Sequence, residues 1–190
     1  MIDRQRLLEL LATRSARHGQ FTLASGRQSS LYIDARLTTM SPEGLALIGP
    51  LALDLLQSSG WSIDAVGGLT LGADPVAYAI AYASARTSKP IRAFTVRKEP
   101  KSHGTGRLIE GPFQAGDHVA IVEDVITTGG SALRAADAVQ AAGGSVAGII
   151  ALVDRQEGGR ETLEERGLKV LSLTTASEIV AQMPAARGSG

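Results

Sequence analysis

Two adjacent carboxylates, Glu123 and Asp124, follow the apolar run Val119–Val122 in this chain of 190 residues. Such a run is typical of a buried strand, and the ligands of open α/β sheets bind outside the carboxyl ends of the strands. A carboxylate in that place can accept hydrogen bonds from neighbouring sugar hydroxyls, or it can hold Mg²⁺. The pair is therefore the first candidate for chemistry in the sequence.

A turn rich in glycine and hydroxyl groups follows the carboxylates and leads into a predicted helix. The first backbone N–H groups of a helix have no intrahelical partner and suit a phosphate. We expect a phosphate to be bound by Thr127, Thr128, Gly129, Gly130 and Ser131, and we include Val125 and Ile126 before them among the residues of the ligand site. Carboxylates beside a phosphate cradle predict a sugar phosphate as the ligand. A solvated strand end with an ordinary helix cap is the alternative; it explains the turn more easily than the whole run.

The run from Val119 to Ser131 resembles the motif with which type I phosphoribosyltransferases bind phosphoribosyl pyrophosphate (PRPP). The resemblance implies their α/β fold, a parallel central sheet flanked by helices, in a single domain of residues 1–190. A small hood would come from residues 1–40 and part of the C-terminal segment. The resemblance also implies a catalytic part for Asp124, and Mg²⁺ held mainly through PRPP. The motif does not identify the nucleobase that is the substrate. It does not establish activity either, since some members of the family are regulators without catalytic activity.

A long interval without a helical pattern separates the apolar run Ile91–Val96 from the carboxylate-bearing strand. So long a connection is usually functional, and we assign residues 97–117 to a mobile loop that covers the ligand. Its first part holds the cations Arg97, Lys98, Lys101 and Arg107, together with His103. Such cations can meet the charge that builds on a departing pyrophosphate, and a histidine can donate a proton near neutral pH. A solvated basic loop is the alternative.

The stretch Arg97–Gly104 resembles the catalytic loop of orotate phosphoribosyltransferases, and the resemblance extends over most of the chain. It implies that Arg97 and Lys98 bind the pyrophosphate of PRPP within their own subunit. It also implies that Lys101 and His103 bind PRPP and act as catalytic residues in the site of the neighbouring subunit. The protein would then be a homodimer.

Two further turns follow predicted strands. Gly67–Pro75 could cradle a second anion, although an ordinary strand-to-helix turn explains it equally well. Arg155 follows the run Val146–Val153, and a guanidinium holds a carboxylate through a bidentate fork. Orotate carries a carboxylate that adenine, guanine and uracil lack, and the resemblance implies that Arg155 and Thr127 contact the base. An exposed arginine in a turn is the alternative. Ala24, where many relatives carry lysine, departs from the family pattern.

Charge and composition narrow the class of protein. The 19 Lys and Arg balance the 19 Asp and Glu, which argues against a nucleic-acid or membrane-surface binder. Residues 86–107 nevertheless hold seven basic residues and one acid, which we interpret as a local cationic lid. The absence of cysteine fits a reducing compartment. No signal peptide or spanning segment is evident, so we expect a cytoplasmic protein without a structural metal.

The hydrophobic pattern predicts an α/β protein. Helices are predicted at 2–16, 42–57, 74–85, 131–141 and 159–166, and strands at 21–23, 31–33, 63–66, 91–96, 119–122, 146–153 and 169–173. Continuous apolar strands that alternate with helices are typical of a parallel sheet covered on both faces. We expect the first two strands to pair with each other and the tail, residues 183–190, to be frayed.

Together these features imply an enzyme that makes orotidine 5′-phosphate and pyrophosphate from orotate and PRPP, in pyrimidine (UMP) synthesis. A purine-type phosphoribosyltransferase is one alternative, and Arg155 and the Lys-x-His loop argue against it. A non-catalytic PRPP-sensing regulator is another, and such a protein has little need of a cationic lid.

Overall fold

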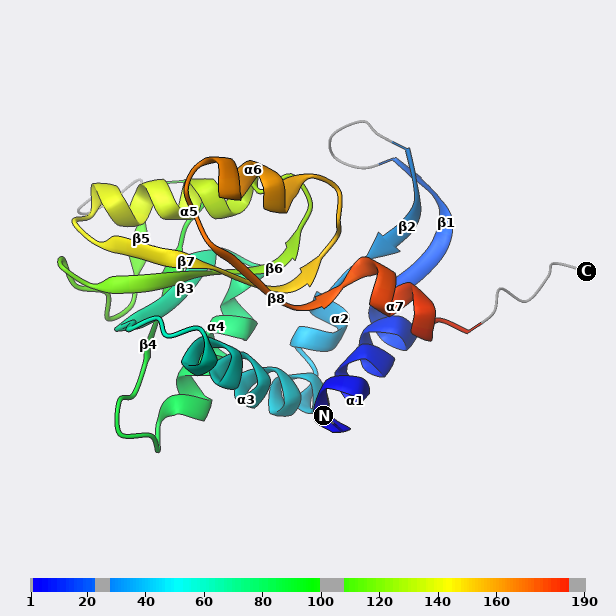
Figure 1. Cartoon of the computed structure of the whole chain (residues 1–190), viewed down its shortest axis with the longest axis horizontal. Coiled ribbons are helices and arrows are strands. Elements are labelled where there is room, and N and C mark those ends of the chain that lie inside the picture. Colours follow the sequence, from blue (N-terminus) through cyan, green and yellow to red (C-terminus); the bar gives the residue numbers. More distant parts are fainter. Residues whose placement is uncertain (1, 23–27, 100–107, 185–190) are drawn as a thin grey trace, which may run out of the picture.

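The computed structural model describes residues 2–22, 28–99 and 108–184 (Figure 1). The helices are α1 (Ile2–Leu10), the π-helical turn η1 (Leu11–Ser15), α2 (Arg36–Thr39), α3 (Pro42–Ser58), α4 (Ala73–Ser84), α5 (Gly130–Ala141), α6 (Gly159–Glu165) and α7 (Ala176–Gln182). The strands are β1 (Ala16–Thr22), β2 (Gln28–Ile33), β3 (Ala65–Leu69), β4 (Arg92–Val96), β5 (Ile109–Glu110), β6 (His118–Ile126), β7 (Ser145–Asp154) and β8 (Val170–Thr175).

Six strands form the central sheet in the order β5-β4-β3-β6-β7-β8. All neighbours are parallel except β5, which pairs with β4 in the antiparallel sense. The chain leaves β3 towards β4 on one side, and returns to β6 on the other side of β3. The strand order therefore reverses between β3 and β6, and a crevice is expected outside the carboxyl ends of these two strands.

Helices cover both faces of the sheet, as predicted (Figure 1). On one face α3 and α4 pack on side chains such as Val66, Ala120 and Val122. On the other face α5 and α6 pack on the strand side chains that point the other way, among them Val119 and Ile121. The central strands read as continuous apolar runs because side chains that alternate in direction are buried on both sides.

A second, two-stranded sheet lies beside the main one, where β1 and β2 pair in the antiparallel sense (Figure 1). The pairing predicted for the first two strands is confirmed, with Phe21 opposite Ser29. The aromatic rings of Phe21 and Tyr32 pack against each other in a tilted arrangement, with centroids 5.3 Å apart. The hairpin continues directly from α1 and η1, and α7 packs against those two helical segments.

Most of the predicted elements are confirmed, and the helix start at Ser41-Pro42 is one example. The Ser41 hydroxyl accepts a hydrogen bond from Gly44 N at 3.1 Å, which is an N-cap. Three expectations were wrong. Ala16 begins β1 instead of ending a helix, the interval 97–117 contains β5, and α2 and α7 were not predicted. Leu23 and all of the predicted frayed tail beyond residue 184 lie outside the described residues.

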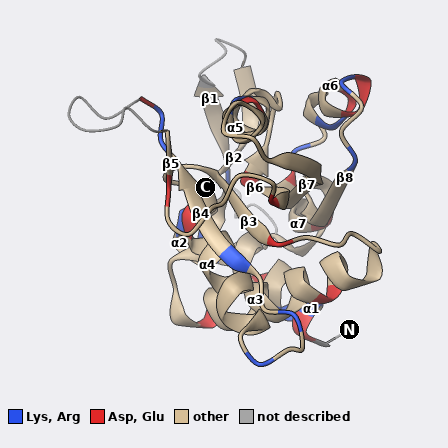
Figure 2. Ribbon diagram, turned by 90° about the vertical axis from the view of Figure 1, so that its left-hand side faces the viewer, with Lys and Arg blue, Asp and Glu red and all other residues tan. Residues whose placement is uncertain are grey.

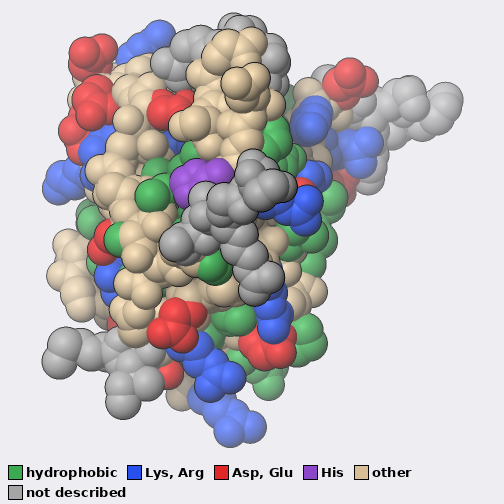
Figure 3. Space-filling view, turned by 90° about the vertical axis from the view of Figure 1, so that its right-hand side faces the viewer, with side chains coloured by type: hydrophobic (Ala, Val, Ile, Leu, Met, Phe, Trp, Pro, Cys, Tyr) green, Lys and Arg blue, Asp and Glu red, His purple; other side chains and the backbone are tan. Residues whose placement is uncertain are grey.

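The surface is mixed in character. Hydrophobic side chains lie scattered between charged ones on the face that Figure 3 shows. Within the described part of the chain, no helix is both long and apolar enough to cross a bilayer.

Candidate active site

A cavity of about 660 Å³ opens at the carboxyl ends of β3 and β6. It is lined by Tyr32, Ile33, Asp34, Ala35, Arg36, Leu69, Thr70, Leu71, Gly72, Lys98, Glu123, Asp124, Val125, Thr127, Thr128, Ser131, Arg134, Arg155 and Glu157. The cavity lies where the strand order reverses, so the topology brings together turns that are far apart in the sequence.

The carboxylate pair lies near the end of β6, inside this cavity. Glu123 is 8% exposed, and Asp124 is half-buried. Burial, and then the charge and hydrogen bond of Asp124, raise the pKa of Glu123 to about 8. Burial also raises the pKa of Asp124, although the N–H of Val125, at 2.9 Å from Oδ1, opposes that rise. The pair therefore carries fewer negative charges at neutral pH than two free carboxylates would.

The turn after β3 forms the wall next to the carboxylate pair. Asp74, in the first turn of α4, is 7% exposed and accepts hydrogen bonds from the hydroxyls of Thr70 (2.7 Å) and Thr95 (2.8 Å). These bonds tie the cavity-lining segment Thr70–Gly72 to α4 and to β4. The peptide bond between Thr70 and Leu71 is cis. Asp74, to which the sequence assigned no role, thus supports one wall of the cavity.

The predicted phosphate turn leads from β6 into α5, and Val125, Thr127, Thr128 and Ser131 line the cavity. Gly129 has φ 80°, a left-handed backbone that favours glycine. Three other predicted binding residues do not line the cavity: Ile126 is buried in the core, and Gly129 and Gly130 shape the turn. The amino end of the 12-residue helix α5 adjoins the hydroxyl groups, an arrangement that suits a phosphate.

Arg155 follows β7 directly and is buried, only 5% exposed. The interpretation as an exposed turn arginine is therefore wrong. Its Nη2 donates to Ser29 Oγ (3.2 Å), to the Leu31 carbonyl (3.1 Å) and to the carboxylate of Glu157. Its Nε is buried and has no hydrogen-bond partner among the described residues. A cavity-lining guanidinium with an unused buried donor is suited to an acidic ligand.

The basic residues of the expected lid do not all lie at the cavity. Lys98 lines it, whereas Arg97 lies 3.8 Å from Glu110 in an ion pair and does not. Arg92 begins β4 at the opposite edge of the sheet and donates to Asp117 at 2.7 Å. Figure 2 shows basic positions spread over separate parts of the ribbon. The single cationic lid over residues 86–107 is therefore wrong, because β4 divides the segment.

Lys101 and His103, predicted to be catalytic, lie outside the described residues, as does Ala24.

Sequence reasoning missed the contribution of the segment after β2. Asp34 and Arg36 line the cavity and form a bidentate pair, with N–O distances of 2.8 and 2.9 Å. That pair lowers the pKa of Asp34 and raises the pKa of Arg36. Arg134 on α5 and Glu157 also line the cavity and were not predicted. The only local sign of this contribution in the sequence was the spacing of Arg36 two residues after Asp34, directly after a strand.

Comparisons with known proteins agree with this geometry. The family model of the phosphoribosyl transferase domain matches residues 39–185. Because the match covers most of the chain, this protein belongs to the phosphoribosyltransferase family, and the predicted type I fold is confirmed.

Several of its similar relatives are orotate phosphoribosyltransferases. The orotate phosphoribosyltransferase of Aquifex aeolicus is 47% identical over 183 residues, which are 95% of this chain and 99% of that one. The Mycobacterium tuberculosis orotate phosphoribosyltransferase in complex with Fe(III) dicitrate has a TM-score of 0.82 at 47% identity, covering 93% of this chain and 98% of that one. Its complex with PRPP has a TM-score of 0.79 at 43% identity, covering 94% and 99%.

Proposed function

We propose that the protein transfers the phosphoribosyl group of PRPP to orotate and releases orotidine 5′-phosphate and pyrophosphate, a step of UMP synthesis. The observation that carries the proposal is Arg155. This arginine lines the cavity on the same edge of the sheet as the carboxylate pair. Its Nε is buried and has no hydrogen-bond partner in the part of the chain that the structure describes. Orotate is the pyrimidine base that brings a carboxylate to such a group.

The described residues divide the work of binding PRPP. Glu123 and Asp124 hold the ribose hydroxyls, since they line the cavity directly before the residues that form the phosphate cradle. The hydroxyls of Thr127, Thr128 and Ser131 and the free N–H groups of α5 hold the 5′-phosphate. Thr127 also lies beside Arg155 along the cavity and contacts the base. Positioning the two substrates in this way removes much of the entropic barrier to transfer.

Magnesium fits this donor set only as a companion of the substrate. No group of three acids or histidines that could hold an ion alone exists among the residues described here. Glu123 and Asp124, with the oxygens of PRPP and water, would supply the oxygen ligands that Mg²⁺ prefers. When bound, the ion neutralises charge on the departing pyrophosphate.

The transfer breaks the bond between the anomeric carbon and pyrophosphate, and the leaving group takes the bonding electrons. A ring nitrogen of orotate forms the new bond to that carbon, and the proton that this nitrogen loses passes to the released pyrophosphate. Carboxylates near the ribose stabilise the positive charge that develops on the sugar, and cations such as Lys98 stabilise the leaving oxygen. No covalent intermediate with the protein is needed.

The loop that begins at Arg97 completes the site in our proposal. It closes over PRPP, and Lys101 and His103 act in the partner subunit of a homodimer. Mixing a Lys101→Ala subunit with an Asp124→Ala subunit would then restore part of the activity, because one of the two sites in the mixed dimer is intact. Equal inactivity of the mixture and of each variant alone would contradict donation between subunits.

We place the reaction in the cytoplasm, in a single domain of residues 1–190 whose hood includes β1 and β2. The decisive experiment offers orotate, adenine or xanthine to the purified protein with PRPP and Mg²⁺. We expect consumption of orotate alone. Consumption of a purine would favour a purine-type enzyme, and PRPP binding without turnover of any base would favour a sensor.

A further inference from the structure

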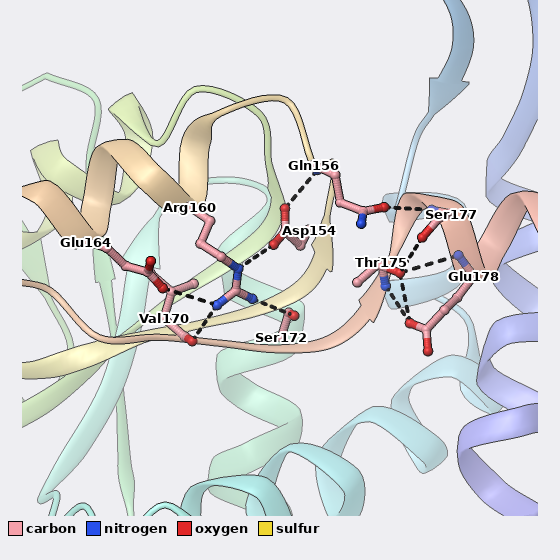
Figure 4. Close-up of polar contacts among 9 residues, drawn as sticks. All are labelled: Asp154, Gln156, Arg160, Glu164, Val170, Ser172, Thr175, Ser177 and Glu178. Carbon is pink, nitrogen blue, oxygen red and sulfur yellow. Dashed lines mark hydrogen bonds and ion pairs between the residues drawn. The ribbon is translucent and has the colours of Figure 1, made fainter.

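The turn that carries Arg155 is fastened by a buried carboxylate that does not line the cavity (Figure 4). Asp154, the last residue of β7, is 4% exposed. Its Oδ1 accepts a hydrogen bond from Gln156 N at 2.8 Å, and its Oδ2 accepts one from Arg160 Nε at 2.7 Å. The carboxylate therefore fixes the backbone on both sides of Arg155.

Arg160 extends this connection from α6 to β8 (Figure 4). Its Nη1 donates to the Val170 carbonyl at 2.8 Å, and its Nη2 donates to Ser172 Oγ at 3.0 Å. A planar guanidinium that serves three acceptors holds them in one geometry. The further ion pair with Glu164, at 3.5 Å, is on the surface and contributes little.

Gln156 makes a second connection, to α7. Its backbone has φ 58°, a left-handed value that residues other than glycine rarely adopt. Its side-chain oxygen accepts a hydrogen bond from Ser177 N at 3.0 Å, in the first turn of α7. That turn is itself fixed by a capping box between Thr175 and Glu178. The exposed side of the turn is thus held by a helix from the C-terminal part of the chain.

Arg155 depends on this support for its direction. Its backbone N–H donates to the Ile126 carbonyl at 3.0 Å, at the end of β6. Its Nη2 is held by the hairpin and by Glu157, which belongs to the same turn. A shift of the backbone at Asp154 or Gln156 would rotate the fork relative to the cavity. A bidentate contact is sensitive to such a rotation, because both hydrogen bonds need the same plane.

We propose that Asp154 and Gln156 are positioning residues that aim Arg155 at the carboxylate of the base and so set the preference for an acidic pyrimidine over a neutral one. The proposal rests on the proposed function. It assigns a part in base selectivity to two residues that lie outside the cavity.

The test uses two variants and a matched control. Asp154→Asn keeps the acceptor for Gln156 N but weakens the charged contact with Arg160. Gln156→Asn suits the left-handed backbone but is too short to reach Ser177. Glu164→Gln is the control, since it removes only the surface ion pair of Arg160. The measurements are KM for orotate, KM for PRPP, and the ratio of kcat/KM for orotate to that for uracil.

We expect KM for orotate to rise about tenfold in both variants while KM for PRPP stays within about twofold, since small misplacements of a binding group are costly. The ratio of orotate to uracil should fall by a similar factor, and the control should match the unmodified protein. Equal rises in both KM values would overturn the proposal, because a merely structural role would disturb the whole cavity.

Gln156 is exposed, so Gln156→Asn still decides the matter if Asp154→Asn fails to fold. Turnover of orotate with an unchanged KM in the folded variants would overturn this inference alone. Absence of any orotate turnover by the unmodified protein would instead overturn the proposed function, and the inference with it.

Discussion

The carboxyl group of Asp124 occupies the space in which a side chain of residue 72 would lie, and Gly72 has no side chain. A Cβ atom on Gly72 would lie 2.5 Å from Cγ, Oδ1 and Oδ2 of Asp124, a distance that real Cβ contacts do not show. Gly72 is also the residue before α4, so the Asp124 carboxyl group adjoins the amino end of that helix. Two turns from neighbouring strands therefore meet with no room for a side chain between them.

This relationship predicts that Gly72→Ala acts through Asp124. The added methyl group forces the carboxylate or the Thr70–Gly72 turn to move, and we expect the affinity for PRPP to fall at least about tenfold. In an Asp124→Ala background the three crowded atoms are absent, so the same substitution should cost little more. Titration calorimetry with PRPP on the four proteins of this cycle measures the coupling. An equal loss in both backgrounds would show that Gly72 matters for another reason.

The raised pKa of Glu123 predicts a pH-dependent stability. Its pKa is about 8 in the folded protein, and an unfolded glutamate has a pKa near 4.3. Between these values the folded state holds a proton that the unfolded state releases, so stability falls as pH rises through this window. Glu123→Gln has no such proton. As pH rises, the free energy of unfolding of Glu123→Gln should therefore increase relative to that of the unmodified protein, by up to about 1.4 kcal/mol per pH unit.

Urea denaturation at several pH values from 5 to 9 checks this expectation, with the exposed Glu165→Gln as the control for net charge. The advantage of Glu123→Gln should grow up to about pH 8 and then level off. A difference that stays constant across the range would mean that Glu123 ionises normally in the folded protein.

Asp74 supplies a third prediction, about the wall formed by the Thr70–Gly72 turn. Asp74→Ala leaves the hydroxyls of Thr70 and Thr95 without their acceptor, and we expect a loss of about 2–3 kcal/mol in the free energy of unfolding. PRPP affinity should fall too, because Thr70 lines the cavity. Tyr78→Phe removes only the exposed hydroxyl 2.9 Å from Thr95 and should cost about 1 kcal/mol or less. Similar losses in both variants would contradict the role given to Asp74.

The sequence was informative wherever a short segment determines its own structure. The apolar run before Glu123 predicts a buried strand, and the residues after it predict a turn into a helix. Parallel topology then places the ends of such strands at one edge, which is why Arg155 and the Glu123–Asp124 pair share a cavity. None of these steps needs a long-range contact to be known in advance.

The hairpin's part in the site could not be predicted in this way. Ser29 and Leu31 contact Arg155 across 126 and 124 residues, and no local pattern reports such a contact. Arg17, His18 and Gln20 in β1 are polar, and this part of the strand owes its conformation to pairing with β2. Counting charges along residues 86–107 failed for a related reason, since β4 separates Arg86 and Lys89 from Arg97 and Lys98 by the length of a strand.

The carboxylate specificity assigned to Arg155 yields the last prediction. Arg155→Lys keeps the positive charge but loses the fork, and Arg155→Gln loses both, so the affinity for orotate should fall in that order. For the glutamine variant we expect a loss of about 100-fold, the equivalent of ~2.7 kcal/mol. The affinity for PRPP should change little, because the phosphate and ribose contacts lie on other turns. Equilibrium binding of each substrate measures both effects, with the exposed Arg166→Gln as the control. If orotate and PRPP lost affinity together, Arg155 would be holding the hairpin through Ser29 and Leu31 rather than reading the base.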